Sequence, residues 1–157
     1  MEQATTLLAA QTHGYVRIEV SYALDFNDTP SLVASVGFDK LIRVGLDAPP
    51  VQEFDAEHCC MLGLTQWPVE TYDLATDVYL VYDRIEQEDN VRDTFVHVTM
   101  HELLHALGLR HVDDVLALMA RSTWGGTPTT LNCNDYREAS RAWGASARRL
   151  SGGRCSE

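Results

Sequence analysis

The sequence lacks any long apolar run, and its first residues lack the pattern of an export signal. No segment approaches the ~20 consecutive apolar residues that a membrane-spanning helix needs. Residues 1–14 have neither a basic start nor a long apolar centre, so we do not predict a signal peptide there. On these residues alone, either the protein is not exported or its leader has been removed.

Positive charge is also scarce. The 157 residues include 12 Lys and Arg against 23 Asp and Glu, a formal charge of −11, and Lys40 is the one lysine. The phosphates of nucleic acids and anionic membrane surfaces would be repelled by such a chain, so we expect neither as a partner. We interpret the acidity as an ordinary soluble surface. The length favours one domain, residues 1–157, that can bury a core of its own.

Paired CxxC cysteines are missing as well, which argues against a cysteine-rich structural zinc site. The four cysteines permit two disulfides in three connectivities and would suit an oxidising compartment. Cys59 and Cys60 are adjacent, so they cannot both readily reach one partner. The pair that we favour is Cys133 with Cys155, and the reduced state stays open.

The first half of the chain reads mainly as strands. Residues 13–26 alternate apolar and polar side chains, which predicts a strand with one buried face. A capping residue before Pro30 predicts a short helix within residues 27–38. Three further segments rich in β-branched and other apolar residues are expected to be strands: 40–50, 59–67 and 76–85.

Two helices are expected in the second half. Residues 91–107 have helical apolar spacing, and their three histidines recur every four residues, so that His97, His101 and His105 form one stripe. A final helix is expected at about residues 135–143. We find neither repeats nor a linker that would divide the chain.

The stripe of histidines has the spacing of a metal site. Two histidines four residues apart, His101 and His105, place both imidazoles on one helix face, where both can reach one zinc ion at about 2.0–2.1 Å. Glu102 cannot join them as a ligand from that stripe. It can instead accept a proton from a water molecule that zinc activates. This HExxH pattern is a moderately specific signal of a zinc hydrolase.

The residues that follow make the signal more specific. Gly108 can take a positive φ and turn the chain away from the helix, so that His111 can return to the same ion. Three neutral imidazoles leave one ligand position open, as a catalytic zinc requires. We interpret the remaining histidines as structural: His97 as a hydrogen-bonded core residue, and His13 and His58 as surface residues.

The segment HELLHALGLRH, residues 101–111, resembles the HExxHxxGxxH signature of the metzincin metallopeptidases, and Met119 resembles their Met-turn residue. Within that clan the chain is most similar to the matrixins, the group of the matrix metalloproteinases. Asp114 and the run Ala-Leu-Met at 117–119 match that group. Leu131, Asp135, Ala139, Trp143 and Gly144 match the matrixin C-terminal helix. The resemblance extends from about Thr76 to Gly144.

The resemblance implies an α+β zincin fold. Its expected parts are a mixed twisted sheet of four to five strands with an antiparallel edge strand, an active-site helix, a Met-turn and a C-terminal helix. An upper subdomain, about residues 1–108, would lie above the substrate cleft and a lower one, about 109–157, below it. Residues 59–67 would be the edge strand, which pairs with an extended substrate. Trp124 would wall the pocket beyond the scissile bond.

The same resemblance assigns roles to two residues of the lower subdomain. Met119 would form a hydrophobic floor beneath the imidazoles without touching the metal. Asp135 would hydrogen-bond the backbone near the Met-turn. The chain departs from the matrixin pattern at Val112, at Ala120 with Arg121, and at Asn134. We predict neither a second zinc site nor a calcium site.

We therefore expect a zinc endopeptidase with one catalytic Zn²⁺, in which Glu102 is the general base and His101, His105 and His111 are the ligands. Its partners would be protein or peptide substrates, and it would act as a monomer. A secreted or extracytoplasmic location is implied by the relatives. Two alternatives stay open: a zinc-bound module that binds peptides without cleaving them, and a peptidase kept latent by a cysteine thiol.

Overall fold

The computed structural model describes residues 1–21, 31–35, 39–46, 62–66, 75–121 and 127–156. Its helices are α1 (Glu2–Gln11), α2 (Tyr82–Ile85), α3 (Val91–Ala106), α4 (Cys133–Trp143) and α5 (Ala147–Leu150). Its strands are β1 (Arg17–Ser21), β2 (Ser31–Ser35), β3 (Asp39–Gly45), β4 (Gly63–Gln66) and β5 (Ala75–Leu80). The chain therefore has a mixed α+β fold.

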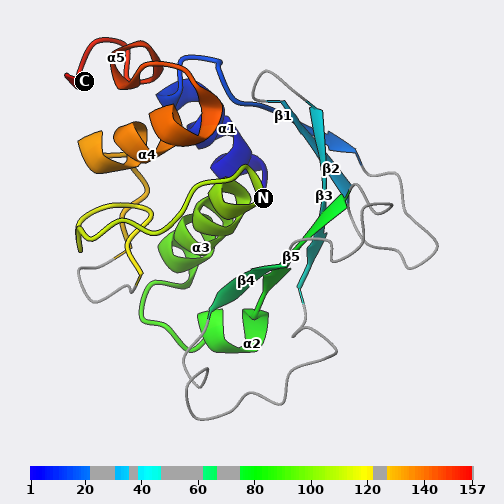
Figure 1. The fold of residues 1–157 in the computed structure, drawn as a ribbon. Helices are drawn as coiled ribbons and strands as arrows, with labels where there is room; N and C mark the ends of the chain where they lie inside the picture. Colours follow the sequence, from blue (N-terminus) through cyan, green and yellow to red (C-terminus); the bar gives the residue numbers. More distant parts are fainter. Residues whose placement is uncertain (22–30, 36–38, 47–61, 67–74, 122–126, 157) are drawn as a thin grey trace.

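The five strands form one mixed sheet in the order β1-β2-β3-β5-β4. Only the central β3–β5 pair is parallel, and β4 pairs antiparallel with β5 at the edge. A parallel pair needs a crossover connection, and residues 46–74 between β3 and β5 contain β4. The expected mixed sheet with an antiparallel edge strand is therefore present (Figure 1).

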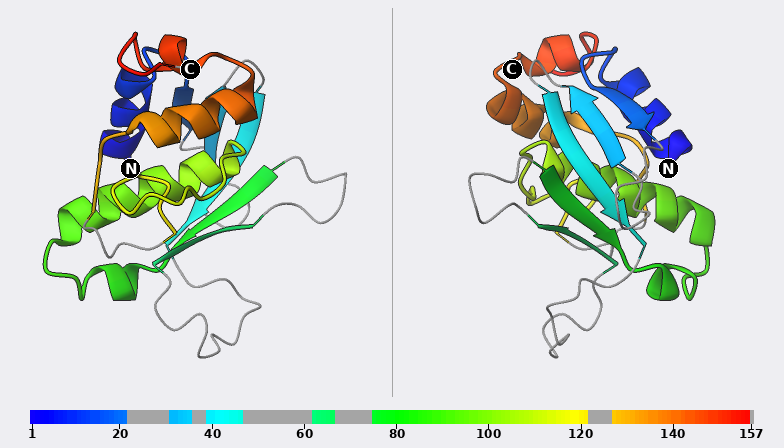
Figure 2. Two further views of the ribbon diagram at one scale, coloured as in Figure 1. Left: turned by 60° about the vertical axis from the view of Figure 1, so that its left-hand side comes forward. Right: turned by 90° about the vertical axis from the view of Figure 1, so that its right-hand side faces the viewer.

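Helices α1, α3 and α4 lie on one face of this sheet, with α3 between the sheet and α4 (Figures 1 and 2). Alternation along β5 turns Thr76, Val78 and Leu80 towards these helices, and all three are fully buried. On α3 the residues Leu103 and Leu104 join the same apolar core. This packing holds α3, with its histidines, against the sheet.

Local sequence determines where the two long helices begin and end. Asn90 caps α3 by accepting a hydrogen bond from the backbone N–H of Asp93, and α4 begins with a capping box between Asn132 and Asp135. Gly144 ends α4 at a φ of +68°, which a glycine adopts without strain. Both helices lie where the sequence predicted them, and α4 begins two residues earlier, at Cys133.

One expectation for the first half is wrong. Residues 27–38 were expected to contain a short helix, but Ser31–Ser35 form β2, which pairs with β1 on one side and β3 on the other. The backbone hydrogen bonds to two neighbouring strands outweigh a local capping signal, and β-branched Val33 suits a strand. The part of 27–38 before Ser31 and after Ser35 lies outside the described residues.

Other boundaries also differ. The strand expected to reach residue 85 ends at Leu80, after which Tyr82–Ile85 form α2. Helix α1 was not predicted, although Ala4 and Leu8 are fully buried on its inner face. Of the expected strand 59–67, the described part contains β4.

The disulfide that the sequence favoured is present between Cys133 and Cys155, which joins the start of α4 to the C-terminal segment. Cys59 and Cys60 lie outside the described residues. In the described part of the chain, no helix has the length and apolarity needed to cross a membrane.

Candidate metal centre

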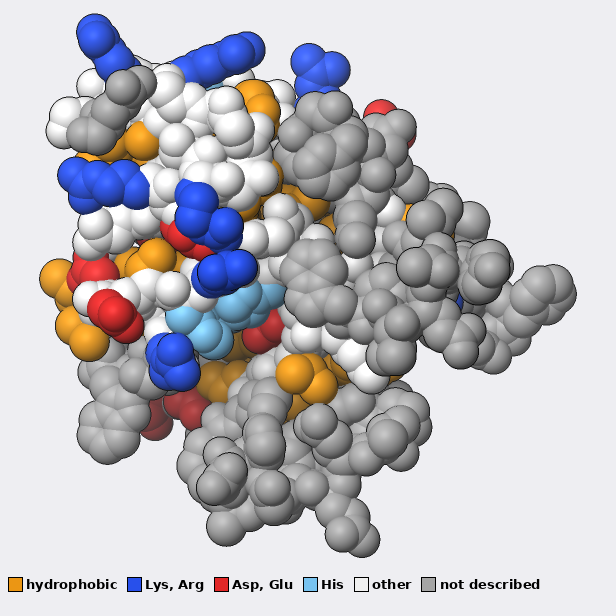
Figure 3. Space-filling model, in the orientation of Figure 1, with side chains coloured by type: hydrophobic (Ala, Val, Ile, Leu, Met, Phe, Trp, Pro, Cys, Tyr) orange, Lys and Arg blue, Asp and Glu red, His pale blue; other side chains and the backbone are white. Residues whose placement is uncertain are grey.

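Three histidine side chains converge at the C-terminal half of α3. The Nε2 atom of His111 lies 3.3 Å from Nε2 of His101 and 3.1 Å from Nε2 of His105. The ligand atoms of these three residues lie within 4.8 Å of one another, close enough to hold one metal ion. Figure 3 shows a group of histidine side chains, in pale blue, near the middle of this molecular face.

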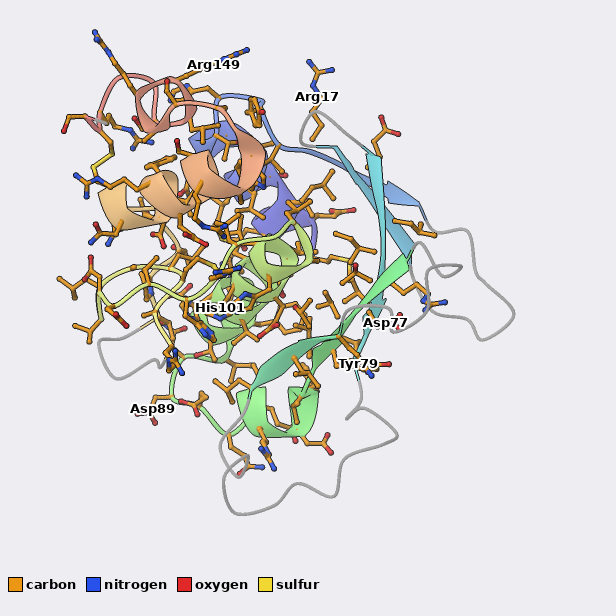
Figure 4. All side chains as sticks on the ribbon, in the orientation of Figure 1. Arg17, Asp77, Tyr79, Asp89, His101 and Arg149 are labelled. Atoms are coloured by element: carbon orange, nitrogen blue, oxygen red, sulfur yellow. A yellow bond between two sulfur atoms is a disulfide. The ribbon has the colours of Figure 1, made fainter. Side chains whose placement is uncertain are left out.

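Backbone carbonyls fix the orientation of the two helix histidines. The Nδ1 atom of His101 lies 2.8 Å from the carbonyl oxygen of Leu118, and Nδ1 of His105 lies 2.8 Å from that of Leu109. Because a carbonyl can only accept, each Nδ1 carries the proton and each Nε2 carries the lone pair. Figure 4 shows His101 on α3, beside the loop that supplies Leu118.

The turn at Gly108 brings the third histidine to the other two. Gly108 has a φ of +98°, a conformation that glycine adopts readily and other residues rarely do. After it, Val112 donates a backbone hydrogen bond to the carbonyl of Met119 at 2.9 Å, which anchors the segment that carries His111. The exposed His111 thus rests on a braced loop.

Asp135 holds the backbone of the turn around Met119. Its two carboxylate oxygens accept hydrogen bonds from the backbone N–H groups of Leu118 at 3.0 Å and Met119 at 2.9 Å. Asp135 and Met119 are both fully buried. The hydrogen bond expected between Asp135 and this backbone is therefore present. That the Met119 side chain forms a floor under the imidazoles stays a prediction.

Partial loss of solvent around the imidazoles favours their neutral form. Desolvation lowers the pKa of His101 to about 3, with a further lowering from neighbouring His105. Desolvation also lowers the pKa of His105 and of His111. All three imidazoles can therefore offer an unprotonated nitrogen at neutral pH, as metal binding requires.

Glu102 lies on the sheet side of α3 and is 6 % exposed. Its Oε2 accepts a hydrogen bond from the hydroxyl of Thr65 on β4 at 2.7 Å. Burial raises the pKa of Glu102 to about 7, and the Thr65 hydroxyl acts against this by lowering it. A cation at the adjacent histidines would favour the ionised carboxylate further.

The donor set fits a zinc ion. Two ligands of a tetrahedral zinc at about 2.0–2.1 Å lie about 3.3–3.4 Å apart, close to the Nε2 separations of 3.3 and 3.1 Å. Without a cation, His111 could donate only one proton, so at least one of its two close contacts would join two lone pairs. The backbone carbonyls that hold Nδ1 of His101 and of His105 also match the usual support of metal-binding histidines.

The other predicted histidines are placed as follows. His97 is buried and its Nδ1 lies 2.7 Å from the carbonyl of Pro128, as expected of a core histidine. His13 is exposed, and both His58 and Trp124 lie outside the described residues. The sequence reasoning did not identify Thr65 as a partner of Glu102.

Comparisons of the chain with protein-family models, curated proteins and solved structures found no match. The interpretation of this site therefore depends on its own residues: the three histidines, Glu102 and the turn braced by Asp135. Their chemistry and their geometry are the basis for a function.

Proposed function

We propose that this protein is a zinc-dependent endopeptidase of the matrixin-like metzincin type. The observation that carries the proposal is the convergence of three neutral Nε2 atoms at the helix that also carries the buried Glu102. Three protein ligands leave one position for water or substrate, which is the arrangement of a catalytic zinc rather than a structural one. His101, His105 and His111 would hold the ion.

Bound zinc and Glu102 would have different roles in peptide hydrolysis. Bound zinc supplies Lewis-acid activation of a water molecule and of the peptide carbonyl. Glu102 accepts a proton from the attacking water and later gives it to the leaving amine. Burial against β4 raises the pKa of Glu102 to about 7, and a cation bound at the histidines would favour the ionised carboxylate, which is the form that accepts the proton.

The substrate would bind as an extended peptide along β4. This strand is at the edge of the sheet and, among the described residues, pairs only with β5. An unpaired edge offers backbone donors and acceptors to a peptide that adds one more strand. β4 also contacts Glu102 through Thr65, so a peptide on this edge would lie close to the carboxylate.

A metzincin-like division of the molecule is part of the proposal. The sheet and α3 would form the upper subdomain, about residues 1–108. The turn around Met119, α4 and the C-terminal segment would form the lower one, about residues 109–157. Of the four cysteines, Cys133 and Cys155 are joined to each other, so a latency thiol would have to be Cys59 or Cys60.

Turnover of a quenched-fluorescent peptide mixture by the zinc-loaded protein tests the proposal. We expect cleavage by the parent protein and a loss of at least about 10²-fold in kcat for Glu102→Gln, because general-base catalysis contributes about that much or more. The zinc content of the Glu102→Gln variant should equal that of the parent, since Glu102 is not a ligand. The absence of cleavage by the reduced, zinc-loaded parent would contradict the proposal and favour a peptide-binding module.

A further inference from the structure

Thr65 and Gly63 on β4 lie on the same face of the strand, because side chains two residues apart point to the same side. That face is turned to α3. The Thr65 hydroxyl is 2.7 Å from Oε2 of Glu102 and 2.9 Å from the backbone oxygen of the same residue. A hydroxyl has one proton, and the bond to an ionised carboxylate is the stronger of the two.

Gly63 lies against the same side chain at a distance that no larger residue permits. A Cβ atom added to Gly63 would lie 2.7 Å from Cγ of Glu102, 2.8 Å from its Oε1 and 2.8 Å from Cγ1 of Val98. Separations this short are well inside ordinary van der Waals contact, so Glu102 or the strand would have to move. Val98 is buried in the core and cannot move freely.

We propose that Gly63 and Thr65 are positioning residues for Glu102, and that they fix the place and orientation of its carboxylate. Thr65 donates a hydrogen bond to Oε2, and Oε1 lies against Gly63. Gly63 provides the space in which this carboxylate lies. The inference rests on the proposed peptidase function for its kinetic consequence only.

The geometry of a strand separates this role from peptide binding. A peptide added to β4 would use the backbone groups in the plane of the sheet, whereas the Thr65 side chain stands roughly perpendicular to that plane. Loss of the Thr65 hydroxyl should therefore affect the chemical step and leave peptide binding almost unchanged. A purely structural link between β4 and α3 would instead affect stability or the peptide edge.

Two measurements test the inference together: steady-state kinetics of the zinc-loaded protein and crystal structures of the metal-free protein. For Thr65→Val we expect kcat to fall about 10–100-fold, the range for misplacing a group that supports a catalytic site, with KM within about twofold and zinc affinity unchanged. Thr65→Ser should restore most of kcat because it restores the hydroxyl. Gly63→Ala should lower kcat similarly, and the Glu102 carboxylate should be displaced in both the Thr65→Val and Gly63→Ala structures.

Two control variants make the same kinds of substitution elsewhere in the sheet, away from Glu102. Thr76→Val removes a buried β5 hydroxyl that has no partner among the described residues. Gly45→Ala adds a Cβ on β3 that, within the same part of the chain, would meet the Tyr79 ring at an ordinary 3.4 Å. Neither should change kcat. The inference is overturned if Thr65→Val keeps the parent kcat, if Thr65→Ser fails to restore it, or if Glu102 keeps its position in the variant structures. Failure of the parent to cleave any peptide would defeat the proposed function, and the metal-free structures would then decide the positioning role alone.

Discussion

Substitution of Asp135 by Asn should destabilise the protein far more than its small change in shape suggests. The two carboxylate oxygens accept three backbone N–H groups, from Leu118, Met119 and Asn132, at 2.8–3.0 Å. An Asn side chain has only one acceptor oxygen, and its NH₂ group would face an N–H group. In the better of its two orientations, Asn would still leave the N–H of Met119 unsatisfied.

The magnitude follows from these contacts. One buried N–H without an acceptor costs about 1–3 kcal/mol, and two remaining bonds that lose their charge cost about 1 kcal/mol each. Removal of the buried charge offsets part of this free-energy cost, because burial disfavours the charged form of Asp135 and raises its pKa. We therefore expect a net loss of about 2–4 kcal/mol in the free energy of unfolding.

Urea unfolding of metal-free protein, followed by circular dichroism, measures this loss directly. Asp113→Asn is the matched control, because Asp113 is exposed on the loop whose backbone Asp135 holds. The zinc affinity of Asp135→Asn should also fall, since Asp135 holds the N–H of the residue whose carbonyl orients His101. A loss below about 0.5 kcal/mol, the range of ordinary surface substitutions, would refute the reasoning.

Three further predictions concern the centre and its supports. Replacing Cys133 and Cys155 by Ser together should lower the free energy of unfolding by about 3 kcal/mol, the chain-entropy value for a 22-residue separation, in the same urea assay; an unchanged midpoint would count against it. Gly108→Ala should cost about 1–2 kcal/mol because of the φ of +98°, and should weaken zinc binding measured with a competing chelator; equal affinity would show that the turn does not position His111. Free zinc at 1,000 times its Kd should stabilise the parent by about 4 kcal/mol, and His111→Ala should lose most of this gain in calorimetric unfolding; equal gains would exclude His111 as a ligand.

The parts of the site that lie close together in the sequence were predictable from it. Helix geometry accounts for the spacing of four residues between His101 and His105. Glycine accounts for the turn at Gly108 that returns His111, and both are local properties. The structure brings the three nitrogens together as that spacing requires. The disulfide of Cys133 and Cys155 could be favoured because the adjacent Cys59 and Cys60 are hard to pair with one partner.

The features that sequence reasoning missed depend on contacts between distant segments. Thr65 and Glu102 are 37 residues apart, and no local pattern indicates that the edge strand meets the carboxylate. The period-two alternation within Gly63–Gln66 could have placed Gly63 and Thr65 on one face, but not against α3. The segment 31–35 was misassigned for a similar reason, since its strand is stabilised by pairing on both sides rather than by its own propensity.

The zinc-edge X-ray absorption spectrum of the reduced, zinc-loaded protein tests the central claim most directly, because it reports the ligand atoms themselves. The arrangement of His101, His105 and His111 predicts three nitrogen ligands and one oxygen ligand, all at about 2.0–2.2 Å. His111→Ala should lose one nitrogen. A sulfur ligand at about 2.3 Å, or a spectrum that His111→Ala leaves unchanged, would contradict the three-histidine centre with an open position.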